Sequence, residues 1–238
     1  MENGFFMWGE RGLVATFFLD LLPSQSHNNL SKFLKEIELA NGNRIKFEPQ
    51  KMWCIIEPNF GNRGFGQPDA IIVFENSKQE KIAILFEAKI NKNYSQSSKS
   101  RGKKGFNSSI NGQLELNYRL TNALKAYPSE EGHLKEPGIS NRYGKTRSLK
   151  DKKVIEKIVK TIVAFNIDYR DYYHVILTND EKNPLISNNN LPQLFDNNIN
   201  NWNELRSNFG WINENKLKPF AEEYLKNGKF LDSYEFVR

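Results

Sequence analysis

Cysteine is almost absent from this sequence, with Cys54 the single one among 238 residues. A lone cysteine can neither close a disulfide within the chain nor build a thiolate zinc cluster, so the expected compartment is the reducing cytoplasm. Cys54 lies in the apolar stretch KMWCIIE, which favours a place in the core over a catalytic role. The histidines are few and scattered, so a histidine-based zinc site is not expected; they are His27, His133 and His174.

Long hydrophobic runs are missing as well. The longest early apolar stretch, LVATFFLDLL, is interrupted by Asp20 and is too short to span a bilayer. No signal-peptide pattern is visible, so we expect no membrane partner.

The composition that is present supports a folded core. Hydrophobic residues make up 38% of the chain and aromatic residues 13%, which excludes global disorder and fits one domain over residues 1–238. The net charge of +6 favours a polyanionic partner, although an ordinary basic soluble protein is an equally good explanation of the charge alone.

Apolar periodicity and turn residues indicate alternating helices and strands. Helices are expected over residues 8–23, 28–42, 110–127 and 148–168, near Trp202 and from Leu217 to Asn227; strands are expected within 43–61, at 70–74 and 82–86, and over 171–180. This order predicts an α/β fold with a mixed central β-sheet flanked by α-helices. The part from about residue 185 to 238 is expected to be a helical and loop extension.

Three charged residues accompany the two central apolar strands. Asp69 opens the first strand, whereas Glu87 and Lys89 are two positions apart in the second and therefore share one face. A hairpin, with its turn near residues 76–79, would bring Asp69 beside Glu87.

Two neighbouring carboxylates repel each other unless a cation lies between them. Mg²⁺ takes oxygen ligands from one or two carboxylates together with water and phosphate, so Asp69, Glu87 and the carbonyl of Ala88 form a candidate magnesium site. Lys89 would then lie beside the attacking water and could stabilise developing negative charge. The alternative is a strand edge with a surface salt bridge between Asp69 and Lys89.

The pair Pro68-Asp69 followed by Glu87-Ala88-Lys89 resembles the signature of the PD-(D/E)XK nuclease superfamily, which comprises restriction-endonuclease-like phosphodiesterases. Four acid-x-Lys tripeptides occur in the chain, beginning at Glu87, Asp151, Asp180 and Glu214, but only the first lies in an apolar strand behind a Pro-Asp. The resemblance implies a restriction-endonuclease-like core and hydrolysis of phosphodiester bonds in nucleic acid, with DNA expected. It also implies Mg²⁺ as cofactor, with Mn²⁺ as a substitute, and a role in restriction or anti-phage defence.

Two further residues match optional elements of the family. Glu10 heads a helical stripe with Val14, Phe17 and Leu21 and is a candidate metal ligand, or else a helix-start residue favoured by the helix dipole. Gln113, on the helix after the core, is a candidate catalytic residue that could contact the attacking water or a phosphate, or else a solvated glutamine.

A basic loop follows the second strand and could track a nucleic-acid backbone, or else be merely solvated. Its cations are Lys92, Lys99, Arg101, Lys103 and Lys104. A second basic cluster spans residues 142–153. Competing functions are a structure-selective resolvase or repair nuclease and a non-catalytic nucleic-acid-binding protein; a homodimer or a partner subunit remains open.

Overall fold

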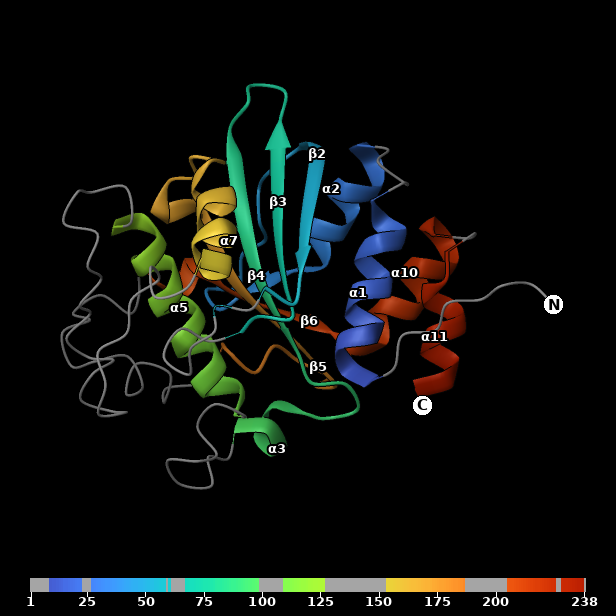
Figure 1. Cartoon of the computed structure of the whole chain (residues 1–238). Helices are drawn as coiled ribbons and strands as arrows, with labels where there is room; N and C mark the ends of the chain where they lie inside the picture. Colours follow the sequence, from blue (N-terminus) through green and yellow to red (C-terminus); the bar gives the residue numbers. More distant parts are fainter. Residues whose placement is uncertain are drawn as a thin grey trace.

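A six-stranded mixed β-sheet forms the centre of the protein, and helices cover both of its faces (Figure 1). This confirms the expected α/β class. The computed structural model describes residues 9–22, 27–58, 60, 67–98, 109–126, 153–186, 205–225 and 228–237. Within these ranges, no helix has the length and apolar character that crossing a membrane would require.

The strands lie in the order β1-β6-β5-β4-β3-β2. Their bounds are Glu38–Leu39 for β1, Pro49–Ile56 for β2, Ala70–Asn76 for β3, Lys81–Ala88 for β4, Tyr172–Thr178 for β5 and Phe209–Asn213 for β6. β2, β3 and β4 pair antiparallel, whereas β4, β5 and β6 pair parallel. The carboxyl ends of these three parallel strands therefore meet at one edge of the sheet, where ligands commonly bind in α/β folds.

The expected hairpin of β3 and β4 is confirmed, with Ala70 opposite Phe86 and Glu75 opposite Lys81. Asn76 shapes its turn, because its Oδ1 accepts hydrogen bonds from the backbone N–H groups of Lys78 and Glu80 at 2.9 and 3.0 Å. Such a side-chain acceptor replaces ladder bonds where the chain reverses.

One face of the sheet is covered by α1 (Gly9–Leu21), α2 (His27–Glu36), α10 (Leu217–Tyr224) and α11 (Phe230–Val237). Buried aromatic rings fill this layer, and Phe18 packs edge-to-face on Phe86 of β4 with centroids 5.2 Å apart. The even-numbered β4 residues Ile82, Ile84 and Phe86 belong to this core. Burying each such side chain contributes roughly 1.5–3 kcal/mol.

The opposite face is covered by α5 (Ile110–Ala126) and α7 (Lys153–Val163) (Figure 1). Leu120 and Leu124 of α5 share a core with Leu85 of β4 and with Ile71 and Val73 of β3. Because strand side chains alternate, the odd-numbered β4 residues, including Glu87, point toward α5.

Two segments that were expected to be helix or loop contain strands, so the prediction was wrong there. The helix expected to reach residue 42 ends at Glu36, and Glu38–Leu39 instead forms β1, which pairs antiparallel with β6. β6 itself lies within the segment expected to hold only helices and loops, so that segment contributes a strand to the central sheet. The short helix α3 (Tyr94–Ser98) lies in the expected basic loop.

Candidate metal-binding and catalytic site

Asp69 is fixed across the end of β4 by two hydrogen bonds. Its backbone N–H donates to the carbonyl of Phe86 at 2.9 Å, and its side-chain Oδ2 accepts from the backbone N–H of Ala88 at 2.8 Å. The residue is only 4% exposed. The carboxylate therefore has a set position beside the last residues of β4.

Glu87 and Lys89 lie at the carboxyl end of β4, on the face that α5 covers. Glu87 is buried, and the Nζ of Lys89 lies 3.0 Å from its Oε1. The structure thus brings Asp69, Glu87 and Lys89 to one side of the sheet. The alternation of β4 places Glu87 and Lys89 there, and Asp69 follows because it precedes Ala70, the register partner of Phe86.

The chain that follows Lys89 is held by acids from the neighbouring parallel strands. Glu214, after β6, accepts a hydrogen bond from the backbone N–H of Asn91 at 2.6 Å. Asp180, after β5, accepts from the backbone N–H of Tyr94 at 2.7 Å. These bonds hold the turn whose Asn91 has a left-handed φ of 57°. Both acids begin other acid-x-Lys tripeptides, and here they bind backbone N–H groups.

The donor atoms at the end of β4 fit a hard divalent cation. Among the described residues, no group of three or more His, Cys, Asp or Glu side chains is arranged to hold a metal ion. Asp69 and Glu87 could supply two carboxylates to such an ion, and Ala88 a backbone carbonyl. Mg²⁺ commonly uses one or two protein carboxylates and completes its shell with water and substrate phosphate, so this small oxygen set suits it.

Glu10 is the second residue of α1, but its side chain lies outside the described residues. Its expected stripe-mates Val14, Phe17 and Leu21 are buried in the core that α1 shares with Phe86. That core lies on the face opposite Glu87. A metal-binding role for Glu10 stays a prediction.

Gln113 lies in the first half of α5, at the level of Glu87. Its neighbour Leu114 packs in a cluster with Ile176 of β5, and Ile176 is the register partner of Glu87. The Oε1 of Gln113 is buried and has no hydrogen-bond partner in the described part of the chain. A buried amide of this kind is suited to a contact with a ligand or water.

Asn117 was missed by the sequence interpretation. It follows Gln113 by one helical turn, is 1% exposed, and neither atom of its side-chain amide has a hydrogen-bond partner among the residues described. Only its burial distinguishes Asn117 from an ordinary helix residue, and the periodicity of this helix does not reveal which polar residues are buried.

Most of the predicted basic loop lies outside the described residues. Lys92 is exposed, and its carbonyl accepts a hydrogen bond from the N–H of Asn179 at 2.8 Å. Its remaining cations, Lys99, Arg101, Lys103 and Lys104, lie outside the described residues, as does nearly all of the basic cluster at 142–153.

Cys54 was expected in the core; it lies in β2, is half-buried and packs against the core from its edge. Burial raises the pKa of its thiol to about 12, so the thiolate is not populated at neutral pH. This disfavours a nucleophilic role.

Comparison of the chain with protein-family models, with curated proteins and with solved structures gave no match.

Proposed function

We propose that the protein is a metal-dependent nuclease of the PD-(D/E)XK type, which hydrolyses phosphodiester bonds in DNA. The observation that carries the proposal is the convergence of Asp69, Glu87 and Lys89 at the carboxyl end of β4. The Asp69 carboxylate bonds to the N–H of Ala88, and Lys89 pairs with Glu87. The mixed sheet flanked by helices on both faces also supports it, because the resemblance implies such a core.

The burial of the two carboxylates favours a cation site over a simple strand-edge ion pair. Asp69 and Glu87 are 4% and 1% exposed, and the Nζ of Lys89 lies 3.0 Å from the Oε1 of Glu87. Carboxylates in a largely buried site are costly in the ionised form unless cations compensate their charge. A divalent cation would add to that compensation and would attract a phosphate group.

The residues divide the chemistry between them. Asp69, Glu87 and the Ala88 carbonyl would hold the ion, which when bound supplies a Lewis acid that polarises a phosphoryl oxygen. The strand and the Ala88 N–H fix the carboxylates before substrate arrives, so little reorganisation is needed. In the reaction, the oxygen of water bonds to phosphorus and the bond to the sugar oxygen breaks, and the phosphoryl group gains negative charge. Lys89 would place a positive charge beside it.

The biological setting follows from the resemblance alone. Restriction or anti-phage defence is our preferred setting, and a structure-selective resolvase or repair nuclease would use the same site. The net charge of +6 suits a nucleic-acid substrate in either setting.

The test is incubation of the purified chain with plasmid, linear duplex, single-stranded DNA and RNA, each with Mg²⁺, Mn²⁺ or EDTA. We expect DNA cleavage with either metal, none with EDTA, and none by the variants Asp69→Asn and Glu87→Gln. Asp232→Asn is the matched control, because Asp232 is an exposed acid on α11. Cleavage by Asp69→Asn at the wild-type rate, or no cleavage of any substrate, would refute the proposal.

A further inference from the structure

Glu214 is a fully buried carboxylate that the proposed chemistry does not use. It opens the short 3-10 helix Glu214–Lys216 directly after β6 and is 0% exposed. Its Oε2 accepts a hydrogen bond from the backbone N–H of Asn91 at 2.6 Å, although the two residues are 123 positions apart. Acidic side chains are almost never fully buried unless they are paired, and a carboxylate binds an N–H group more strongly than a neutral acceptor does. This contact therefore ties the end of β6 to the turn that follows Lys89.

The turn after Lys89 crosses the carboxyl end of β5 to reach Glu214. In the sheet, β5 lies between β4 and β6, so two strand spacings, roughly 10 Å, separate β4 from β6. The N–H of Lys89 donates to the carbonyl of Leu177 at 2.9 Å. The N–H of Asn179 donates to the carbonyl of Lys92 at 2.8 Å. Contacts with β5 thus lie on both sides of the contact with Glu214.

Asn91 shows what the turn would lose without its acid partner. It has a left-handed φ of 57°, which asparagine tolerates better than most residues but does not prefer. The residue is itself exposed, so the core does not hold it in place. Segments with few buried contacts open locally at a low cost in free energy. We therefore expect the hydrogen bond to Glu214 to decide how often this turn opens.

β6 gives the buried acid a rigid support, since five consecutive register pairs join β6 to β5. At the carboxyl ends of the two strands, the Nδ2 of Asn215 donates to the Oδ1 of Asn179 at 2.7 Å. The Nε1 of Trp211 donates to the Oγ1 of Thr178 at 2.9 Å. These side-chain bonds reinforce the strand pairing beside Glu214, so the acid keeps a set position relative to the end of β5.

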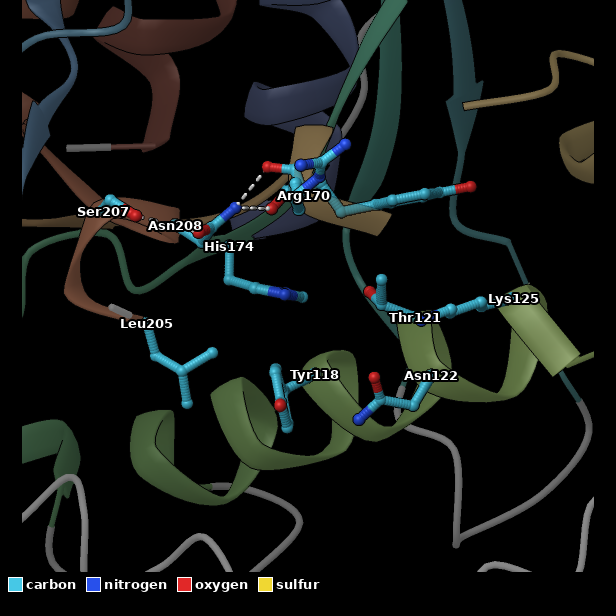
Figure 2. Close-up of a pocket in the computed structure, with 10 residues that line it drawn as sticks. Tyr118, Thr121, Asn122, Lys125, Arg170, His174, Leu205, Ser207 and Asn208 are labelled. Atoms are coloured by element: carbon cyan, nitrogen blue, oxygen red, sulfur yellow. Dashed lines mark hydrogen bonds between the residues drawn. The ribbon is translucent and has the colours of Figure 1, made fainter. Parts of the chain in front are cut away.

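The amino ends of β5 and β6 are held in a comparable way and offer a matched control. There the Nδ2 of Asn208 donates to the carbonyls of Arg170 and Tyr172 at 2.7 and 2.8 Å (Figure 2). These residues border a pocket of about 440 Å³ whose walls come from α5, β5 and the segment before β6, and which His174 and Lys125 also line. A change at Asn208 would weaken the same pair of strands at their opposite ends, without touching the turn after β4.

We propose that Glu214 is a positioning residue of the candidate site, which holds the turn after β4 and thereby keeps Lys89 against Glu87. Lys89 directly follows β4, and its Nζ lies 3.0 Å from the Oε1 of Glu87. Reacting groups must be placed within a fraction of an ångström, so a turn that opens would lower the rate even where substrate still binds. The effect on the rate rests on the proposed nuclease function, whereas the effect on the motion of the turn does not.

Hydrogen exchange followed by NMR tests the clamp without substrate or metal. Glu214→Leu keeps most of the side-chain volume and removes the acceptor. We expect the amide of Asn91 to exchange about tenfold faster in this variant, the equivalent of one lost hydrogen bond, whereas amides of β3 keep their rates. Glu214→Gln retains an acceptor oxygen and should keep most of the protection. Asn208→Ala, the matched control, should leave the exchange of Asn91 unchanged.

Cleavage kinetics test whether the clamp acts through Lys89. Glu214→Leu should lower kcat for DNA cleavage about tenfold with little change in KM, and Glu214→Gln should restore most of the rate. In a Lys89→Ala background, Glu214→Leu should lower kcat by less than about twofold, because the group that it positions is already absent. Asn208→Ala should keep the wild-type rate. Equal losses from Glu214→Leu in both backgrounds would show a general structural role and overturn the proposal.

The exchange and rate measurements separate the two proposals. If the wild type cleaves no nucleic acid, the nuclease proposal fails, and the exchange of Asn91 still decides whether Glu214 holds the turn. Unchanged exchange in Glu214→Leu would overturn the inference. A wild-type Asn91 amide that exchanges as fast as an unstructured peptide would overturn it as well. This last measurement needs no variant, so it decides the result if thermal melting shows that Glu214→Leu does not fold.

Discussion

At the scale of single residues, the placement of Asp69, Glu87 and Lys89 at one end of β4 could be predicted from the sequence. Each is a charged residue within or next to an apolar strand, where charges are unusual. Strand alternation predicts that Glu87 and Lys89 share a face. Asn117 and His174 could not be found in this way. Their importance comes from burial without hydrogen-bond partners among the described residues, and burial depends on the packing of α5 on β5.

Lys89 should act on the rate more than on binding. Lys89→Ala removes a positive charge that the carboxylate site holds 3.0 Å from Glu87. We expect kcat for DNA cleavage to fall on the order of 10²-fold, with KM changed far less, because the charge is most valuable in the transition state. Single-turnover kinetics at saturating metal measures this. An unchanged rate with poorer binding would make Lys89 a phosphate contact only.

His174 should make the protein sensitive to acid. Burial lowers its pKa from the ordinary value of 6.5 to about 3, so between these values the unfolded chain binds a proton that the folded protein does not. Its contribution to stability is complete above about pH 6.5 and is lost as the pH falls, by at most about 1.4 kcal/mol per pH unit.

Urea unfolding at pH 7 and pH 5 measures this loss in the wild type and in His174→Phe. The variant has no imidazole to protonate, so its free energy of unfolding should fall less between the two pH values. Tyr118, Tyr172, Lys125 and Arg170 face the same pocket and are present in both proteins, so the difference between the two losses reports His174. Equal losses in both proteins would contradict the assignment of the acid sensitivity to His174.

At the scale of elements, local patterns predicted the β3–β4 hairpin but not β1 or β6. The apolar runs of β3 and β4 are joined by a polar turn, so neighbouring residues suffice. Ile37, Glu38 and Leu39 also fit the periodicity of α2, and the pairing of Glu38 and Leu39 with β6 favours the extended form. Gly210 in β6 shows how closely the two segments approach, because a Cβ there would lie 2.7 Å from Cγ2 of Ile37. Such long-range pairing overrides local propensity.

The basic loop after α3 can be tested as one element. Replacing Lys99, Arg101, Lys103 and Lys104 together by Gln should weaken DNA binding and flatten its dependence on salt. Each lost phosphate contact reduces the slope of log K against log salt by about 0.9. Fluorescence anisotropy at several salt concentrations gives the slope, and a four-fold Gln variant of exposed lysines elsewhere, Lys78, Lys157, Lys182 and Lys229, is the control for net charge. An unchanged slope would show that the loop is only solvated.

At the scale of the whole molecule, a contact between segments far apart in the chain completes the layer over one sheet face. The Oδ2 of Asp20 at the end of α1 accepts a hydrogen bond from the N–H of Phe230 at the start of α11 at 2.5 Å. Phe17 of α1 also packs edge-to-face on Phe230, with centroids 5.1 Å apart. A Cβ on Gly228 would collide with the Asp20 carboxylate at 2.2 Å, so the chain passes very close to it.

Asp20→Ala should therefore loosen α11 from α1. The substitution removes the acceptor of a part-buried hydrogen bond, so the backbone N–H of Phe230 loses this partner. The free energy of unfolding should fall by about 1–3 kcal/mol. Chemical denaturation measures the loss, and Asp232→Ala, an exposed acid on α11, should change stability by less than about 0.5 kcal/mol. Equal stability of the Asp20→Ala variant and the wild type would show that the aromatic contacts alone secure α11.

The pairing of early and late segments has a consequence for synthesis of the protein. α1 packs with α11, and β1 pairs with β6, so α1 and β1 lack these later partners until residues 209–237 have left the ribosome. Ribosomes add about 5–20 residues per second, which leaves the aromatic side of the growing sheet without α10 and α11 for roughly ten seconds or more. A nascent chain that waits this long with phenylalanines exposed is a natural client for a chaperone that binds apolar segments. The emergence of β6 and Glu214, rather than local helix formation, would then set the moment at which the turn after Lys89 becomes rigid.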